Sequence, residues 1–187
     1  MTPLYIGLAI IAVLVLWTVF AYNRFVSMVQ RGREAWADID VQLKRRYDLI
    51  PNLIETVKGY ATHEKTVLDD VTNARARAMG ATSDLNQRGE AENMLSSTLK
   101  SLFAVSENYP DLKANTNFLE LQRELSDTEN KIQASRRFYN GVVRDLNTAM
   151  QSFPGNIIAN VFRFESREFF ELAQDEEAAR QPVAVKF

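Results

Sequence analysis

The sequence predicts an all-α protein: an N-terminal transmembrane helix followed by an antiparallel long-helix bundle of three to four helices with coiled-coil-like packing. Three observations predict this fold class. An apolar run without charged residues covers positions 4–22. Apolar residues then recur in steps of three and four along most of the chain, which is the spacing of a buried helix face. Only 7 glycines and 5 prolines occur in 187 residues, so long loops are expected to be scarce.

The apolar run reads LYIGLAIIAVLVLWTVFAY and is followed by Arg24, Arg31 and Arg33. As a helix at about 1.5 Å per residue it would extend about 28 Å, close to the hydrocarbon thickness of a bilayer. A cleaved signal peptide is the alternative, but no basic residue precedes the run, which is also longer than a usual signal-peptide core. The positive-inside rule then predicts an amino terminus outside and a cytoplasmic domain.

A long amphipathic helix is predicted directly after this anchor, ending at Gly80. Pro51 leaves two interpretations open. The stripe stays in phase across Pro51, which favours one continuous, kinked helix; alternatively Asp48 caps a new helix that has Pro51 in its first turn. The stripe is apolar apart from Gly32 and Glu64 and consists of Phe25, Val29, Gly32, Trp36, Ile39, Leu43, Tyr47, Ile50, Ile54, Val57, Tyr60, Glu64, Val67, Val71, Ala74 and Ala78.

A second helix is predicted over residues 90–108, and Pro110 follows it as a boundary. Either Asp111 or Asn117 is expected to cap the next helix through its side chain. The second stripe consists of Ala91, Leu95, Leu99, Leu102, Ser106 and Tyr109.

The third helix has the most regular pattern, because its stripe keeps a 3.5-residue repeat through five heptads. Such a repeat predicts left-handed, coiled-coil-like packing. Polar residues in or near the stripe are expected to fix the register of the packed helices, or to face another protein. The stripe is Phe118, Leu121, Leu125, Thr128, Ile132, Ser135, Tyr139, Val142, Leu146, Ala149 and Phe153, and its further polar neighbours are Glu129, Asn130, Asn140 and Asn147.

The chain therefore divides into an anchor at 1–23, a cytoplasmic helical bundle at 24–153, a short Phe-rich helix at 154–172 and a polar tail at 173–187. Six of the 11 phenylalanines fall in the last 35 positions. The Phe-rich helix is expected to pack its aromatic face on the bundle; the alternative is an element that docks on a membrane surface or a partner.

Composition excludes several kinds of chemistry. The net charge of −2 is not that of a nucleic-acid-binding protein. There is no cysteine, and His63 is the only histidine, so a di-iron bundle or a cysteine zinc site is excluded by count. No G-x-S-x-G elbow or phosphate-binding loop occurs. We predict no catalytic, metal or cofactor-binding residues and no small-molecule substrate; an enzyme built on His63 and Glu64 is the least favoured hypothesis.

The triplet Lys44-Arg45-Arg46 is the most basic stretch after the anchor, but three nearby aspartates balance its charge. A continuous helix would place it about 33 Å from the membrane interface, several Debye lengths away. The triplet is therefore expected to form an exposed basic ridge, either simply solvated or docking a partner protein.

The chain resembles the LemA family of bacterial membrane-anchored proteins. The resemblance rests on AWADIDVQLKRRYDLIPNLIETVKGYATHEK at 35–65, AVSENYPDLKANTNFLELQRELSDTENKIQASRRFYN at 104–140 and FPGNIIA at 153–159. It implies one amino-terminal membrane helix in the inner membrane, a helical bundle, and no established activity or cofactor. It also implies links to envelope maintenance, membrane proteases and organelle-membrane formation. The segments DLIPNL and TENKI are implied to be packing or partner surfaces.

The function predicted is that of a non-enzymatic scaffold, anchored in the bacterial cytoplasmic membrane, that binds partner proteins or assembles with itself. A regulatory adaptor of a membrane protease or signalling system is the alternative. No small-xxx-small spacing marks a dimerisation face in the apolar run. The residues predicted to dock a partner are Lys44, Arg45, Arg46, Tyr47, Pro51, Asn52, Glu129 and Asn130.

Overall fold

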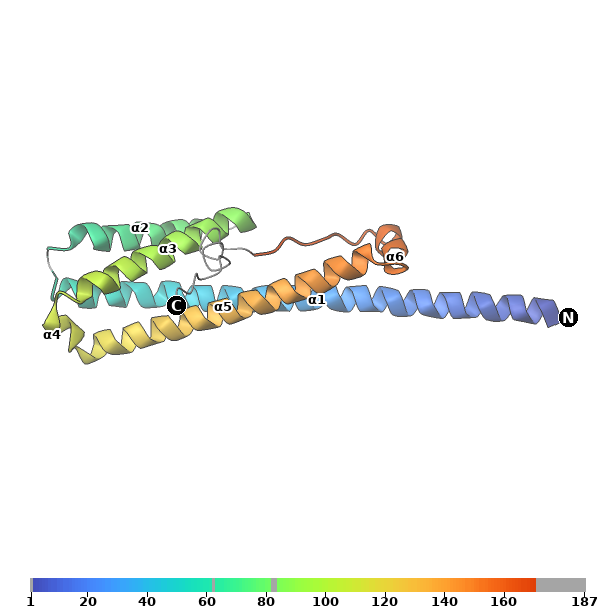
Figure 1. Ribbon diagram of the computed structural model, residues 1–187, viewed down its shortest axis with the longest axis horizontal. Helices are drawn as coiled ribbons and strands as arrows, with labels where there is room; N and C mark the ends of the chain where they lie inside the picture. The colour runs from blue at the N-terminus through green and yellow to red at the C-terminus, as the bar shows by residue number, and fades with distance from the viewer. Residues whose placement is uncertain (1, 62, 82–83, 171–187) are drawn as a thin grey trace, which may run out of the picture. The chain divides into compact units, whose positions relative to one another are not determined.

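The structure is a computed structural model that describes residues 2–61, 63–81 and 84–170 (Figure 1). Within these ranges the chain forms helices and no strand, which confirms the predicted all-α class. The tail expected at 173–187 lies outside the described residues. The helices are α1 (Thr2–Lys58), α2 (Lys65–Gly80), α3 (Leu85–Ser106), α4 (Pro110–Lys113), α5 (Thr116–Gln151) and α6 (Gly155–Val161).

The first helix, α1, is uninterrupted over 57 residues. Its N-terminal part is apolar and exposed on every side; Leu4, Leu16 and Phe20 are each about two-thirds exposed. By length and composition this part is able to cross a membrane. The predicted membrane helix is therefore present as a helix, and it continues directly into the amphipathic part of α1.

Pro51 lies inside α1, so the continuous helix is the correct one of the two interpretations. A proline has no backbone N–H, and the carbonyl four residues before it therefore lacks its helical donor. That carbonyl belongs to Tyr47, and Arg75 of α2 supplies the missing donor: its Nε donates to Tyr47 O at 2.8 Å. A side chain of the second helix thus compensates for the backbone hydrogen bond that Pro51 removes from the first.

We predict that the contribution of Arg75 to the free energy of unfolding depends on the presence of Pro51. Arg75→Met is expected to lower the free energy of unfolding by about 1 kcal/mol, because the Tyr47 carbonyl loses its donor. In the Pro51→Ala background the loss is expected to disappear, since the alanine N–H takes over that carbonyl. Urea unfolding of the four proteins in mild detergent, followed by circular dichroism, measures the coupling. An equal loss in both backgrounds would contradict the assignment.

The prediction of one helix up to Gly80 is wrong, because α1 ends at Lys58 and α2 begins at Lys65. Gly59, a poor helix former, follows α1 directly. The N–H groups of Tyr60 and Ala61 both donate to Val57 O, at 3.0 and 2.8 Å, and close the helix end. The regular spacing continues across this turn through Tyr60, which is 43% exposed, and Glu64, which is polar; each helix buries its own part of the stripe.

The boundaries of the next helices also differ from the prediction. Helix α3 begins at Leu85 rather than at position 90, since the Asp84 side chain accepts a hydrogen bond from the Asn86 N–H at 2.9 Å. Neither Asp111 nor Asn117 caps α5. Asn115 does so, because its Oδ1 accepts from the Phe118 N–H at 3.0 Å.

The described residues fall into two compact units, and each is treated by itself. The second unit, residues 39–134 with Phe170, contains the C-terminal part of α1, then α2, α3, α4 and the N-terminal part of α5. The four longer segments run side by side with alternating directions (Figure 1), which is the predicted antiparallel bundle. Its buried core includes Ile39, Leu43, Ile50, Leu53, Val57, Val71, Leu95, Leu102, Phe118 and Leu125.

The first unit comprises residues 2–38 and 135–169. It contains the N-terminal part of α1, the C-terminal part of α5, and α6. Its core is formed by Phe25, Leu146, Ile158 and Ala159, with Phe164 packed against them. The stripe predicted for the third helix fails only at its last member, Phe153, which lies beyond the end of α5 and is 80% exposed.

The Phe-rich helix predicted at 154–172 is also wrong in length, because α6 ends at Val161 and the chain is extended at 164–170. The Asn147 side chain of α5 binds this extended segment through both its amide atoms. Its Nδ2 donates to Arg167 O at 2.8 Å, and its Oδ1 accepts from the Arg167 N–H at 3.0 Å. Residues 164–170 are therefore held by a side chain rather than by their own helical hydrogen bonds.

The extended segment also explains the glycine in the apolar stripe of α1. A Cβ built on Gly32 would lie 3.2 Å from Nη1 of Arg167, so the Arg167 side chain occupies the space over this position. The aromatic part of the segment packs as expected, with Phe164 stacked on Phe25 at a centroid distance of 5.1 Å. Within the first unit, Phe164 thus packs on the helices as predicted, whereas Phe153 is exposed.

Candidate functional site

The structure separates the eight residues predicted to dock a partner into two groups. Arg46 and Tyr47 are buried and Glu129 is partly buried. The prediction of an exposed basic ridge is therefore wrong for Arg46, which is only 2% exposed. The physical reason is rotation about the helix axis: Arg46 lies about 60° from Leu43 on the helix circumference and falls within the buried stripe. The exposed group consists of Lys44, Arg45, Pro51, Asn52 and Asn130.

Arg46 is the middle of a buried polar centre, defined here as Arg46, Tyr47, Glu92, Ser96 and Glu129. Nη1 of Arg46 donates to Glu129 Oε2 at 2.7 Å and to Ser96 Oγ at 3.0 Å. Nη2 of Arg46 pairs with Glu92, and the Tyr47 hydroxyl donates to the same carboxylate. The buried polar centre thus connects α1, α3 and α5, and it brings Arg46 and Glu129, assigned to docking from sequence, into one internal ion pair.

Burial controls the electrostatics of this centre. Desolvation lowers the pKa of Arg46, while the negative charge of Glu129 and the hydrogen bond to it oppose that shift. An arginine nevertheless remains a cation at any working pH, so Arg46 keeps its charge in this centre. The buried ion pair between Arg46 and Glu92 favours one arrangement of the helices. A shift of one helix would leave a buried charge without its partner.

Sequence reasoning missed two members of this centre, Glu92 and Ser96. Glu92 precedes Leu95 by three positions and is 3% exposed, so it belongs to the buried face of α3. A glutamate in phase with an apolar stripe was the available signal, since charged residues are almost never fully buried without a partner.

We predict that Tyr47 makes the free energy of unfolding fall at alkaline pH. Burial raises the pKa of Tyr47 above its ordinary value near 10. Above about pH 10 the unfolded chain therefore loses the phenol proton while the folded chain keeps it, and the free energy of unfolding falls as pH rises. Unfolding in urea between pH 8 and pH 11 measures this slope, and Tyr47→Phe is expected to reduce it. An identical slope in both proteins would show that other groups cause the loss.

His63 lies in the turn between α1 and α2 and is exposed. Its neighbour Glu64 accepts a hydrogen bond from the Tyr109 hydroxyl at 3.0 Å. Among the residues that the structure describes, no group of three or more histidine, aspartate or glutamate side chains is placed to hold a metal ion.

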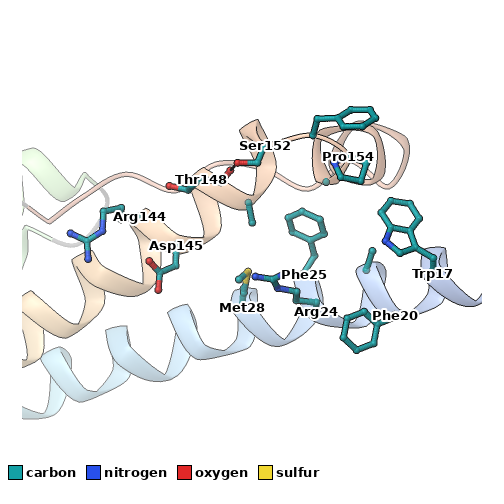
Figure 2. A pocket seen from close by; sticks show the side chains of 14 residues that line it. Trp17, Phe20, Arg24, Phe25, Met28, Arg144, Asp145, Thr148, Ser152 and Pro154 are labelled. Atoms are coloured by element: carbon teal, nitrogen blue, oxygen red, sulfur yellow. Dashed lines mark hydrogen bonds between the residues drawn. The ribbon is translucent and has the colours of Figure 1, made fainter.

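The first unit contains a groove of about 510 Å³ between α1, the C-terminal part of α5 and the turn before α6. Figure 2 shows its two different ends: Trp17 and Phe20 lie at one end, and Arg144 and Asp145 at the other. Gly155 permits the start of α6 to approach the end of α5 closely, since a Cβ at this position would lie 2.5 Å from Ala149 O.

Two arginines line this groove, Arg24 from α1 and Arg144 from α5. Both are exposed, and neither forms a hydrogen bond or an ion pair with any residue in the described ranges. Asp145 is the one acidic side chain in the lining, so the groove carries a formal charge of one positive unit. The groove therefore offers an apolar end and two unpaired guanidinium groups, a combination suited to an amphipathic anion.

Comparison with known protein families identifies the family of this chain. The model of the LemA family matches residues 35–187. The chain belongs to the LemA family. The family match contains the buried polar centre, whereas Trp17, Phe20 and Arg24 of the groove precede it.

Three relatives of this LemA-family chain show distant similarity. Protein LemA of Metamycoplasma hominis is 26% identical over 133 residues, which is 71% of this chain and 61% of that protein. Magnetosome protein MamQ 2 of Paramagnetospirillum magneticum is 22% identical, with 87% of this chain and 68% of that protein covered. Magnetosome protein MamQ of Magnetospirillum gryphiswaldense is 21% identical, with 80% and 64% covered. The matched region is thus under two thirds of the length of the LemA protein.

Proposed function

We propose that this LemA-family protein is a non-enzymatic scaffold, anchored in the bacterial cytoplasmic membrane by positions 4–22, that binds partner proteins or further copies of itself. The observation that carries the proposal is the continuity of α1. One uninterrupted helix of 57 residues contains both the apolar segment and the helical face from which Arg46 joins the bundle. A direct helical connection between a membrane segment and a helical bundle suits a protein that keeps a protein-binding surface at a membrane.

The chemistry of the second unit supports a structural rather than a catalytic role. Its most deeply buried titratable groups, Arg46, Tyr47 and Glu92, hydrogen-bond to one another. Most of their donors and acceptors are thereby used within the fold; the exception is Nε of Arg46, which is buried without a hydrogen-bond partner among the described residues. The relatives named LemA and magnetosome protein MamQ carry no enzyme name, which agrees with this part of the proposal.

The proposed orientation has the amino terminus outside and the helical units in the cytoplasm. Arg24, Arg31 and Arg33 are all exposed on α1 directly after the apolar segment, as the positive-inside rule requires of a cytoplasmic flank. The chain has no cysteine, so single cysteines report topology without interference. In intact cells a membrane-impermeant maleimide is expected to label T2C but not N130C; the reverse pattern would overturn this orientation.

The surface proposed to bind a partner is the exposed group Lys44, Arg45, Pro51, Asn52 and Asn130. Chemical crosslinking of the full chain in mild detergent is expected to give species larger than the monomer. K44E/R45E is expected to weaken them, because it reverses the charge of this surface. K100E is the matched control, since Lys100 is an exposed lysine of α3 in the same unit. If crosslinking gave only the monomer, the scaffold proposal would be overturned.

A further inference from the structure

We infer that the groove of the first unit is a seat for one membrane phospholipid, whose phosphate lies on the side of the groove lined by Arg24 and Arg144 and whose acyl chains follow Trp17 and Phe20. The inference rests on the proposed membrane anchoring, and it adds a specific lipid partner to it. It is carried by the position of the groove along α1, by its unpaired charges and by the apolar surface beside it.

The groove crosses the end of the apolar run. Trp17 and Phe20 belong to positions 4–22, while Arg24 is the first charged residue after them. Along a helix the step from Trp17 to Arg24 is about 10 Å, comparable with the depth of a lipid headgroup layer. When positions 4–22 span a bilayer, the apolar end of the groove therefore lies among upper acyl chains and the arginine end among the headgroups.

Charge selects a phosphate as the group bound at the polar end. Arg24 and Arg144 are unpaired among the described residues and come from different helices on the same groove (Figure 2). A guanidinium matches the geometry of phosphate oxygens through paired N–H donors. Asp145 reduces the net charge to one positive unit, which suits a monoanionic phosphodiester.

The surface next to the groove supports a lipid rather than a free phosphate. The turn before α6 and α6 itself expose large apolar side chains: Phe153 is 80% exposed, Val161 67% and Ile157 50%. The end of α6 is held at the level of the apolar run, because Phe162 packs on Tyr22 with a centroid distance of 4.8 Å. Apolar side chains exposed at this level suit the interfacial layer of a bilayer.

The depth of this surface is testable in vesicles of equimolar phosphatidylcholine and phosphatidylglycerol. Full-length F153C and R137C are labelled with an environment-sensitive fluorophore and exposed to lipids that carry a quencher near the headgroup. Arg137 is an exposed residue of α5 outside the groove, and R137C is the control. We expect quenching at position 153 and little at 137; equal quenching at the two positions would overturn the placement.

The lipid seat is tested by native mass spectrometry of the full chain with phosphatidylglycerol in detergent. R24Q/R144Q is expected to weaken lipid binding by about fivefold for each arginine removed. The matched control R33Q/R137Q removes two exposed arginines from the same helices outside the groove and is expected to leave binding unchanged. Equal binding by both variants would overturn the seat, and so would displacement of the lipid by inorganic phosphate alone.

These outcomes are independent of the scaffold test. Loss of crosslinked species with lipid binding intact would contradict the scaffold alone. Loss of the difference between R24Q/R144Q and R33Q/R137Q, with crosslinked species intact, would contradict the lipid seat alone.

Discussion

Replacing Arg46 by methionine is expected to lower the free energy of unfolding by about 3–5 kcal/mol. The substitution removes the cation but leaves the Glu92 carboxylate, which is 3% exposed, without its ion-pair partner. A buried charge without a partner costs several kcal/mol, far more than the net contribution of an intact pair. The loss therefore comes mainly from Glu92, since Glu129 is about one-third exposed and water can solvate it.

Urea unfolding in mild detergent, followed by circular dichroism, measures this effect. In R46M/E92L both charges are replaced by apolar side chains, and most of the stability is expected to return. Lys44→Met is the control for the loss of a basic residue, because Lys44 is exposed two positions away on the same helix; its effect is expected to stay within about 0.5 kcal/mol. Equal effects of R46M and K44M would show that the ion pair does not stabilise the fold.

Replacing Leu125 by aspartate is expected to destabilise the bundle by about 4 kcal/mol or more. Leu125 lies in the stripe of α5 and is 4% exposed in the core of the second unit. The substitution removes a buried apolar side chain and places a carboxylate in the core without an ion-pair partner. The bundle either loses its packing at this layer or opens to hydrate the charge, and both outcomes reduce stability.

Leu119→Asp is the matched control for this substitution. Leu119 is in the same helix but is 42% exposed, so a carboxylate there stays in water. Its thermal midpoint is expected to lie close to that of the unchanged protein, while the midpoint for L125D falls well below it. An unchanged midpoint for L125D would mean that the stripe of α5 is assigned to the wrong face.

Sequence reasoning predicted α5 and the continuity of α1 well, because both depend on local periodicity. The 3.5-residue repeat of α5 buries Leu125, Ile132 and Leu146 as expected. The unbroken phase across Pro51 correctly favoured one helix. Caps and turns were predicted less well, since several residues at each boundary had suitable side chains and only packing selected Asp84 and Asn115.

The predicted docking residues show a different limit. Exposure of Lys44 and Arg45 was expected from their charge, but the same reasoning placed Arg46 on the surface. The ion-pair partners of Arg46 are 46 and 83 positions away in the chain, so no local window contains the whole buried polar centre. The groove escaped prediction for the same reason, because Arg24 and Arg144 line one groove only through the packing of α1 on α5.

The sequence by itself therefore determined the elements whose cause is local: the apolar run, the amphipathic helices and the continuity through Pro51. Only the tertiary structure decided the reversal at Gly59, the interior position of Arg46 and the presence of Arg24 and Arg144 on one groove. The physical reason is that helix periodicity depends on neighbours within a few residues. Burial of a charge and the lining of a groove depend instead on groups that distant segments bring together.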